Sequence, residues 1–122
     1  MEKIYISGSQ MSRFLVEVAR TPQELSTGLS NRKSLPPRQG MLFIFPKVGL
    51  QSMWMPSMNF SLDIVWLDAN KTIVKIDTNV SPCSGNKNCK NYSSIYPVLY
   101  AIELNAGDAS LIGLSVGKAL SF

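Results

Sequence analysis

The sequence predicts one mainly β domain over residues 1–122, a compact antiparallel sandwich or distorted barrel with one or two short helices. Apolar and polar side chains alternate along residues 13–19 and 98–105, which is the period of a strand with one buried face. Residues 62–67 and 72–78 are predicted strands joined by the four residues Asp68-Ala69-Asn70-Lys71, as in a β-hairpin. The predicted strands recur at near-regular spacing, which favours an antiparallel arrangement over a parallel α/β sheet.

The first third of the chain contains the clearest helix signal. Residues 3–7 predict a short strand before the strand at 13–19. The segment Thr21-Pro22-Gln23-Glu24 then supplies a capping hydroxyl, a proline for the first helical position and the glutamate of a capping box. Gly28 is typical of a helix end, and the prolines within residues 31–40 predict a loop.

The remaining elements follow from apolar runs and their breakers. Residues 41–45 are continuously apolar and predict a strand buried on both faces, and residues 51–55 predict the next strand. In the turn of the hairpin, Asn70 is expected to take the left-handed conformation. Residues 81–97 predict a long polar loop, of the kind that is usually functional or mobile. A helical turn over 108–112 and a last strand over 118–122 complete the chain.

Composition and charge exclude several classes of function. The chain has no histidine, which removes Ser-His-Asp and Cys-His catalysis and histidine-based metal sites. We therefore expect no metal and no cofactor. The net charge is +4 and the basic residues are dispersed, which favours a solvated surface over a nucleic-acid-binding one. No apolar run approaches the roughly 20 residues of a membrane span.

Asp63 is placed between apolar residues of a predicted strand, on the same face as Val65 and Leu67. A buried carboxylate costs several kcal/mol unless it is paired or hydrogen-bonded. Arg32 is the expected partner, because a guanidinium can hold a carboxylate through two bonds. The pair would either be structural or supply charge to a binding pocket; the other alternative is an edge-strand Asp63 that faces water.

Glu103 lies on a predicted strand face opposite Tyr100, Ile102 and Leu104, and the expected environment is solvent. With Asp63 it could instead form the carboxylate pair of a glycoside hydrolase, in which the two groups are roughly 5–10 Å apart across a cleft. That second hypothesis requires both carboxyl groups on one face of the sheet.

Trp54 and Met55 are candidate ligand contacts. With Met53 and Met58 they form an aromatic and methionine-rich stretch, which suits adaptable apolar contact with a ligand or packing in the core. The stretch runs into Pro56, so it is expected to end at a loop, where the Trp-Met pair would line a pocket mouth.

Cys83 and Cys89 lie in the predicted long loop with five residues between them. A structural disulfide is the favoured interpretation, with two free thiols or a metal or redox role as alternatives. A disulfide would indicate an oxidising compartment, the periplasm or the exterior, whereas free thiols would fit the cytoplasm. Residues 1–10 do not form a signal peptide, so either the protein is cytoplasmic or a signal precedes this chain.

Several short motifs together resemble a known family. They are Gly28-Leu29 with Arg32, the segment 40–45, Trp54-Met55, Leu62-Asp63-Ile64 and the segment 103–107. In this order they resemble domain-of-unknown-function family 192, also called uncharacterised protein family 0127. The resemblance implies a compact, mainly β domain of bacteria and archaea, often behind a signal peptide, with no established activity. Pro56 and Ser61 stand where the family usually has a basic residue and a proline.

The sequence therefore predicts a non-catalytic module that binds a small molecule or peptide outside the cytoplasm. The expected ligand-binding residues are Arg32, Trp54, Met55, Asp63 and Glu103, and no residue is expected to be catalytic. The alternatives are a carbohydrate-active hydrolase that uses the carboxylate pair, and a structural module that binds another protein through an apolar patch.

Overall fold

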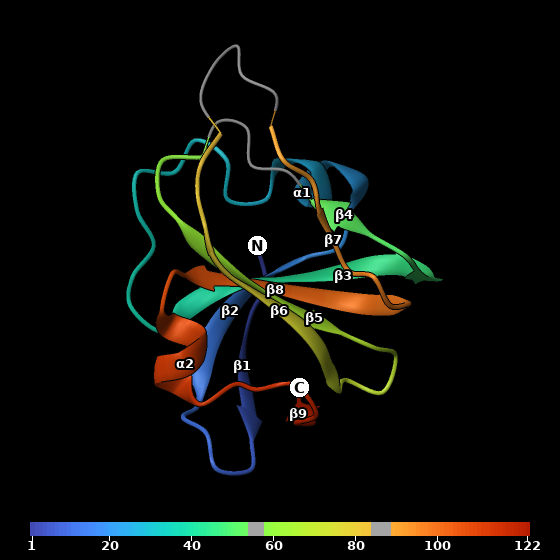
Figure 1. Ribbon diagram of the computed structural model, residues 1–122. Coiled ribbons are helices and arrows are strands. Elements are labelled where there is room, and N and C mark those ends of the chain that lie inside the picture. The colour runs from blue at the N-terminus through green and yellow to red at the C-terminus, as the bar shows by residue number, and fades with distance from the viewer. Residues whose placement is uncertain (54–57, 84–88) are drawn as a thin grey trace.

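Seven strands form one curled sheet in the computed structural model of the chain, and two further strands form a separate ribbon (Figure 1). The structure describes residues 1–53, 58–83 and 89–122. The strand order in the sheet is β6-β5-β8-β3-β2-β1-β9, and β4 pairs with β7. The elements are β1 (Lys3–Gly8), β2 (Phe14–Ala19), α1 (Pro22–Thr27), β3 (Gln39–Gly49), β4 (Ser52–Met53), β5 (Leu62–Leu67), β6 (Ile73–Val80), β7 (Tyr92–Ser93), β8 (Val98–Asn105), α2 (Asp108–Ile112) and β9 (Leu120–Ser121).

The two edges of the sheet meet at one end, which makes the sheet a distorted half-barrel. Thr72, directly before β6, forms an isolated antiparallel bridge with Ala119, directly before β9. Beside it, the Ile73 amide donates to the Lys118 carbonyl at 2.9 Å. The predicted mainly β fold, a distorted barrel with short helices, is therefore confirmed.

One neighbouring pair of strands is parallel, whereas the sequence predicted antiparallel pairing. Leu15 of β2 lies beside Gln39 of β3, and Ala19 lies beside Phe43. A parallel pair needs a crossover connection between its strands. Helix α1 and the loop after it supply that connection, because they carry the chain from the end of β2 back to the start of β3 (Figure 1).

Helix α1 begins and ends at the predicted residues. The Glu24 amide donates to the Thr21 hydroxyl at 3.1 Å, and the Thr21 amide donates to the Glu24 carboxylate at 3.1 Å, which is a complete capping box. Gly28 closes the helix, and its amide donates to the Glu24 carbonyl at 2.9 Å. Neither helix in the described part of the chain is long and apolar enough to cross a membrane.

The predicted hairpin is formed by β5 and β6. The Asp68 carboxylate organises its turn by accepting from the amides of Asn70 and Thr72, at 2.9 and 3.0 Å. Lys71 has the left-handed conformation, with φ 64°, so the prediction for Asn70 is wrong. The hydrogen bond from the Asn70 amide to the Asp68 carboxylate forms an Asx turn, and the residue with the left-handed conformation is the one after Asn70.

The sheet has an apolar core on each face. The inner core lies within the curl, because it joins residues of both edge strands to α2: Ile6, Phe14, Val16, Leu42, Val65, Leu67, Ile73, Ile102, Leu104, Ala109, Ile112, Leu114 and Leu120. The outer core lies on the opposite face, beneath the segment that follows α1: Ala19, Leu29, Leu35, Met41, Phe43, Met58, Leu62, Ile64, Trp66, Val80, Val98 and Ala101. The central strands are therefore buried on both faces, as the run at 41–45 predicted for β3.

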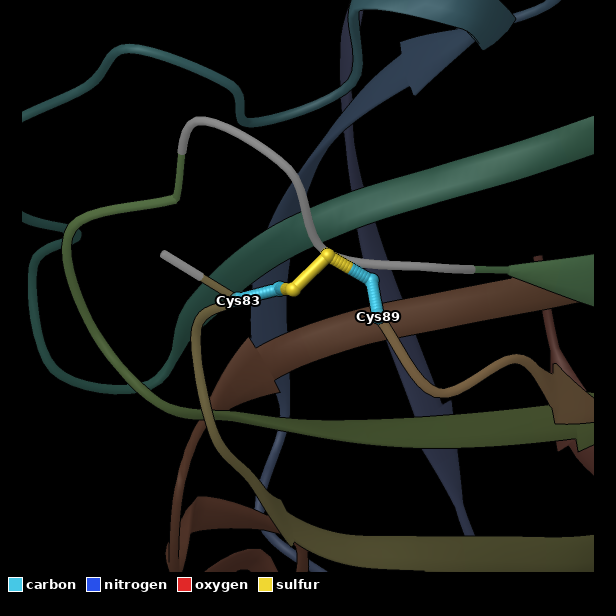
Figure 2. Close-up of a disulfide and its surroundings, with 2 residues drawn as sticks. All are labelled: Cys83 and Cys89. Atoms are coloured by element: carbon cyan, nitrogen blue, oxygen red, sulfur yellow. A yellow bond between two sulfur atoms is a disulfide. The ribbon is translucent and has the colours of Figure 1, made fainter. Parts of the chain in front are cut away.

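The segment predicted as a long polar loop contains a short strand and a disulfide. Strand β7 pairs with β4, with Ser93 opposite Ser52. Cys83 and Cys89 are bonded, and their Cα atoms are 5.5 Å apart (Figure 2). The favoured disulfide is thus confirmed. Because it closes a small ring, it stabilises the fold by roughly 2 kcal/mol in the chain-entropy account.

Candidate functional site

Glu103 lies in a row of side chains that crosses the outer face of the sheet. On β8 it stands opposite Met41 of β3 and Ile64 of β5, and both neighbours belong to the outer core. Only 5% of Glu103 is exposed. The expectation that it faces solvent is wrong, because the segment around the end of α1 covers this part of the sheet.

The carboxyl group of Glu103 opens on a cavity of about 250 Å³ between the end of α1, β3 and β4. This volume is below the roughly 300–1,000 Å³ of pockets that hold drug-sized ligands, so the cavity suits a small molecule. Its walls combine apolar side chains with hydroxyl groups, and they include Phe43, Met53, Met58, Ser26, Ser30 and Ser52.

Gly28 keeps the cavity open above Glu103. Its φ of 49° and ψ of −130° belong to a region that residues with a side chain rarely adopt. A Cβ atom built on Gly28 would lie 3.1 Å from Cζ of Phe43 and 3.8 Å from Oε1 of Glu103. The glycine therefore both ends α1 and leaves the approach to the carboxyl group free.

Among the described residues, none donates a hydrogen bond to the Glu103 carboxyl group or forms an ion pair with it. Burial raises the pKa of Glu103 to about 7, because the charged form loses its hydration. A buried carboxyl group that titrates near neutral pH and faces a cavity is a candidate for ligand contact.

Asp63 is satisfied by backbone N–H groups, and its predicted pair with Arg32 is wrong. The residue is 1% exposed. Its Oδ1 accepts from the Asn79 amide at 3.0 Å, and its Oδ2 accepts from the amides of Gly107 and Ala109 at 3.0 and 3.1 Å. The last two amides belong to the start of α2, where backbone donors lack partners within the helix. Asp63 therefore ties β5 to α2.

Arg32 pairs with a different carboxylate. Its guanidinium donates to Oε2 of Glu17 on β2, and both side chains are partly buried. The two residues border a separate hollow of about 220 Å³. An ion pair of Arg32 thus holds the loop after α1 against the sheet, as one of the expected alternatives stated. The acid is Glu17 of β2 rather than Asp63 of β5.

The carboxylate pair of the hydrolase hypothesis is excluded by the strand register. Asp63 is opposite Leu104, whereas Glu103 is opposite Ile64. Because directly paired residues share a face, Asp63 points to the inner core and Glu103 to the outer core. The two carboxyl groups lie on opposite faces of the sheet and cannot flank one substrate.

The predicted site residues are not brought together. Glu103, Arg32 and Asp63 border three different hollows. Trp54 and Met55 lie outside the described residues. Their neighbours Met53 and Met58, which the sequence grouped with them, line the Glu103 cavity.

Five residues that line the Glu103 cavity were not predicted from the sequence: Gly28, Phe43, Ser26, Ser30 and Ser52. The one signal that could have found them is the helix end at Gly28, because a glycine that closes a helix over an apolar strand leaves space beside it. Within the described ranges, no group of three or more Cys, Asp or Glu residues could hold a metal ion.

Comparisons with known proteins identify relatives of the whole chain. The model of the family DUF192, described as "Uncharacterized ACR", matches residues 4–122. The crystal structure of a proposed transcription regulator from Sinorhizobium meliloti 1021 is 30% identical, with a TM-score of 0.86; the alignment covers 98% of this chain and 91% of that one. A protein of unknown function from Novosphingobium aromaticivorans DSM 12444 is 24% identical, with a TM-score of 0.87 over 98% of this chain and 85% of that one, a likeness of fold alone. No curated protein matches the chain.

Proposed function

This chain belongs to domain-of-unknown-function family 192, and from that premise we propose that it is a non-catalytic module that binds a small molecule in the cavity above Glu103. One observation carries the proposal: Glu103, a residue that is 5% exposed, has no hydrogen-bond or ion-pair partner among the described residues, and its carboxyl group opens on a cavity of about 250 Å³. A protein gains nothing in stability from such a group, since burial without a partner is costly. A bound ligand would supply the missing partner.

Three further features support this proposal. The chain has no histidine and the separated acids leave no paired carboxylates for hydrolysis, so binding fits the site better than catalysis. Trp54 and Met55 remain candidate contacts, because they stand in the chain between two residues of the cavity wall. The disulfide favours a location outside the cytoplasm, where such bonds persist.

A fragment screen by thermal unfolding tests the proposal. At a concentration about 100 times its Kd, a ligand of the native state stabilises by about 2.7 kcal/mol, which raises the Tm of a domain of this size by several degrees. We expect at least one small polar fragment to give such a shift in the wild type, and Ser26→Phe, which narrows the cavity, to abolish it.

Gln23→Phe is the matched control for this screen. It adds the same side chain to the same exposed helix at a position that does not line the cavity, so the thermal shift should persist. A screen that finds no stabilising fragment, or fragments whose effect survives Ser26→Phe, would contradict a binding function for this cavity.

A second candidate function, protein interaction, is favoured by a strained and exposed isoleucine. Ile95 has φ 64°, a left-handed conformation that is an outlier for a β-branched residue, and it is 60% exposed. Its amide donates to the Ser93 hydroxyl at 3.0 Å, which helps to hold it there. A second exposed apolar residue, Leu50 with 68% exposure, directly precedes Gln51, whose amide donates to the Ser94 hydroxyl at 3.1 Å. Strain retained on a surface suggests selection for contact.

Replacing Ile95 by asparagine is expected to stabilise the fold by about 1 kcal/mol, because asparagine tolerates the left-handed conformation. Ile95→Val, which keeps the β-branch, should give no gain. Urea denaturation measures the difference. Equal stability of all three proteins would show that the left-handed conformation of Ile95 carries no strain. If Ile95 also mediates contact between copies of the protein, the wild type and Ile95→Val should show concentration-dependent sedimentation, and Ile95→Asn should not.

A further inference from the structure

Three acidic residues stand in one row across the outer face of the sheet. The register places Glu17 of β2 beside Met41, Met41 beside Glu103, Glu103 beside Ile64, and Ile64 beside Asp77 of β6. The acids therefore occupy alternate strands of the same face. All three side chains are carboxyl groups on one face of the sheet, so their partners can be compared directly.

The chain supplies a cation to the two outer acids of this row. Glu17 pairs with Arg32, and Oδ1 of Asp77 lies 3.3 Å from Nζ of Lys75. Oδ2 of Asp77 also accepts from the indole N–H of Trp66 at 2.9 Å. Glu103 is the most buried of the three, and no lysine or arginine of the described ranges reaches it. Of the three acids in the row, Glu103 is therefore the one without a cation from the described part of the chain.

We infer that the ligand of the Glu103 cavity is a small organic cation, a primary ammonium group on a short apolar body. This inference rests on the proposed function and names the class of its ligand. The ammonium nitrogen would lie at the Glu103 carboxylate, in the position that Arg32 and Lys75 occupy at the neighbouring acids.

The cavity wall fits such a cation. An ammonium group has three N–H donors and no acceptor, so it needs several acceptors. The Glu103 carboxylate is one acceptor, and three lining residues, Ser26, Ser30 and Ser52, each carry a hydroxyl group that can accept. The Phe43 ring can attract a cation through its π face, and Met53 offers the apolar body a polarizable contact.

The protonation of Glu103 couples this binding to pH. Burial raises the pKa of Glu103 to about 7, so only the deprotonated protein, which dominates above that pH, is competent to bind a cation. Few other charges face the group. On α1 the titratable residue is Glu24, whose carboxylate accepts from two backbone amides of the helix cap. In the segment after α1, Arg32 is paired with Glu17, and strand β4 contains no titratable residue. On β3 and β5 the neighbours are Met41, Phe43 and Ile64.

Titration with two probes of equal size tests the inference: n-butylammonium chloride and 1-butanol, followed by NMR of the protein at about pH 5.5 and about pH 8.5. For a carboxyl pKa of about 7, the competent fraction falls roughly 30-fold between these conditions. We therefore expect butylammonium to bind about 30-fold more weakly at the lower pH, with shifts that map to the cavity wall. Butanol should bind weakly and with little dependence on pH.

Two variants assign the effect to one carboxyl group. Glu103→Gln should weaken butylammonium at the higher pH at least 10-fold and remove its pH dependence. Asp77→Asn, which neutralises an outer acid of the same row and keeps an oxygen that can accept from the Trp66 indole, should leave both unchanged.

The inference and the proposed function fail in different ways. Butanol binding in the cavity as tightly as butylammonium at both pH values would overturn the inference and leave the binding function in place. Binding of neither probe would also overturn the inference, and the fragment screen with Ser26→Phe would then decide the function independently.

Discussion

Replacing Asp63 by alanine is expected to destabilise the protein by about 3–5 kcal/mol, at the upper end of the range for single substitutions. The carboxylate accepts from the amides of Asn79, Gly107 and Ala109, and alanine would leave all three donors without this acceptor. Each buried donor that loses its partner costs about 1–3 kcal/mol. The substitution would also weaken two connections of β5, because the amides belong to the end of β6 and to the start of α2.

Urea denaturation of a graded series tests this expectation. Asp63→Asn retains one acceptor oxygen, so its cost should be about half that of the alanine variant. Asp108→Ala is the matched control, because Asp108 accepts from one backbone amide, that of Arg38 at 2.9 Å, and should cost about 1 kcal/mol. A loss below about 1 kcal/mol for Asp63→Ala would mean that the three hydrogen bonds do not hold α2 against the sheet.

Glu103→Gln is expected to stabilise the protein by about 3 kcal/mol at pH 8 and to change its stability little at pH 4. Burial raises the pKa of Glu103 from its ordinary 4.5 to about 7 in the folded protein. Between these values the native state binds the proton more tightly than the unfolded state, so the free energy of unfolding falls as the pH rises. Each pKa unit corresponds to about 1.4 kcal/mol, and the whole cost is present above about pH 7.

The difference between variant and wild type isolates this effect, because the other titrations cancel. Glu24 is the one other described group with a resolved shift. Backbone N–H groups of Arg20 and Thr21 lower its pKa, so its contribution is lost as the pH falls below its ordinary value, outside the window of Glu103. Chemical denaturation at intervals from pH 4 to 8 would give the curve, with Glu17→Gln as control. A difference that does not grow between about pH 4.5 and 7 would contradict a buried, unpartnered carboxyl group.

Local signals predicted most of the secondary structure. The capping box of Thr21 and Glu24, the hairpin of β5 and β6, and the helical turn at 108–112 depend on residues close in sequence, and all are present. The two-residue strand β7 was not predicted, because a strand this short exists only through its pairing with β4. The parallel pairing of β2 with β3 was missed for a similar reason: strand direction is set by partners rather than by alternation.

The candidate site divides in the same way. Two acids in apolar strands, Asp63 and Glu103, were visible from the sequence. The partners of Asp63 were not, because backbone amides carry no side-chain signal and the Gly107 amide is 44 residues away along the chain. Arg32 was correctly expected to pair with an acid, but Glu17 could be chosen only once β2 lay beside β3.

The amino-acid sequence by itself determined the mainly β class, the capped helix, the family and the presence of one acid, Asp63, where an apolar side chain belongs. Only the tertiary structure decided that Asp63 has its partners and that Glu103 opens on a cavity. The physical reason is that β5 and β8 pair so that the two acids point to opposite faces, and each face is covered by a different helix and its flanking segment. What covers a buried charge depends on packing between distant segments, which no local pattern records.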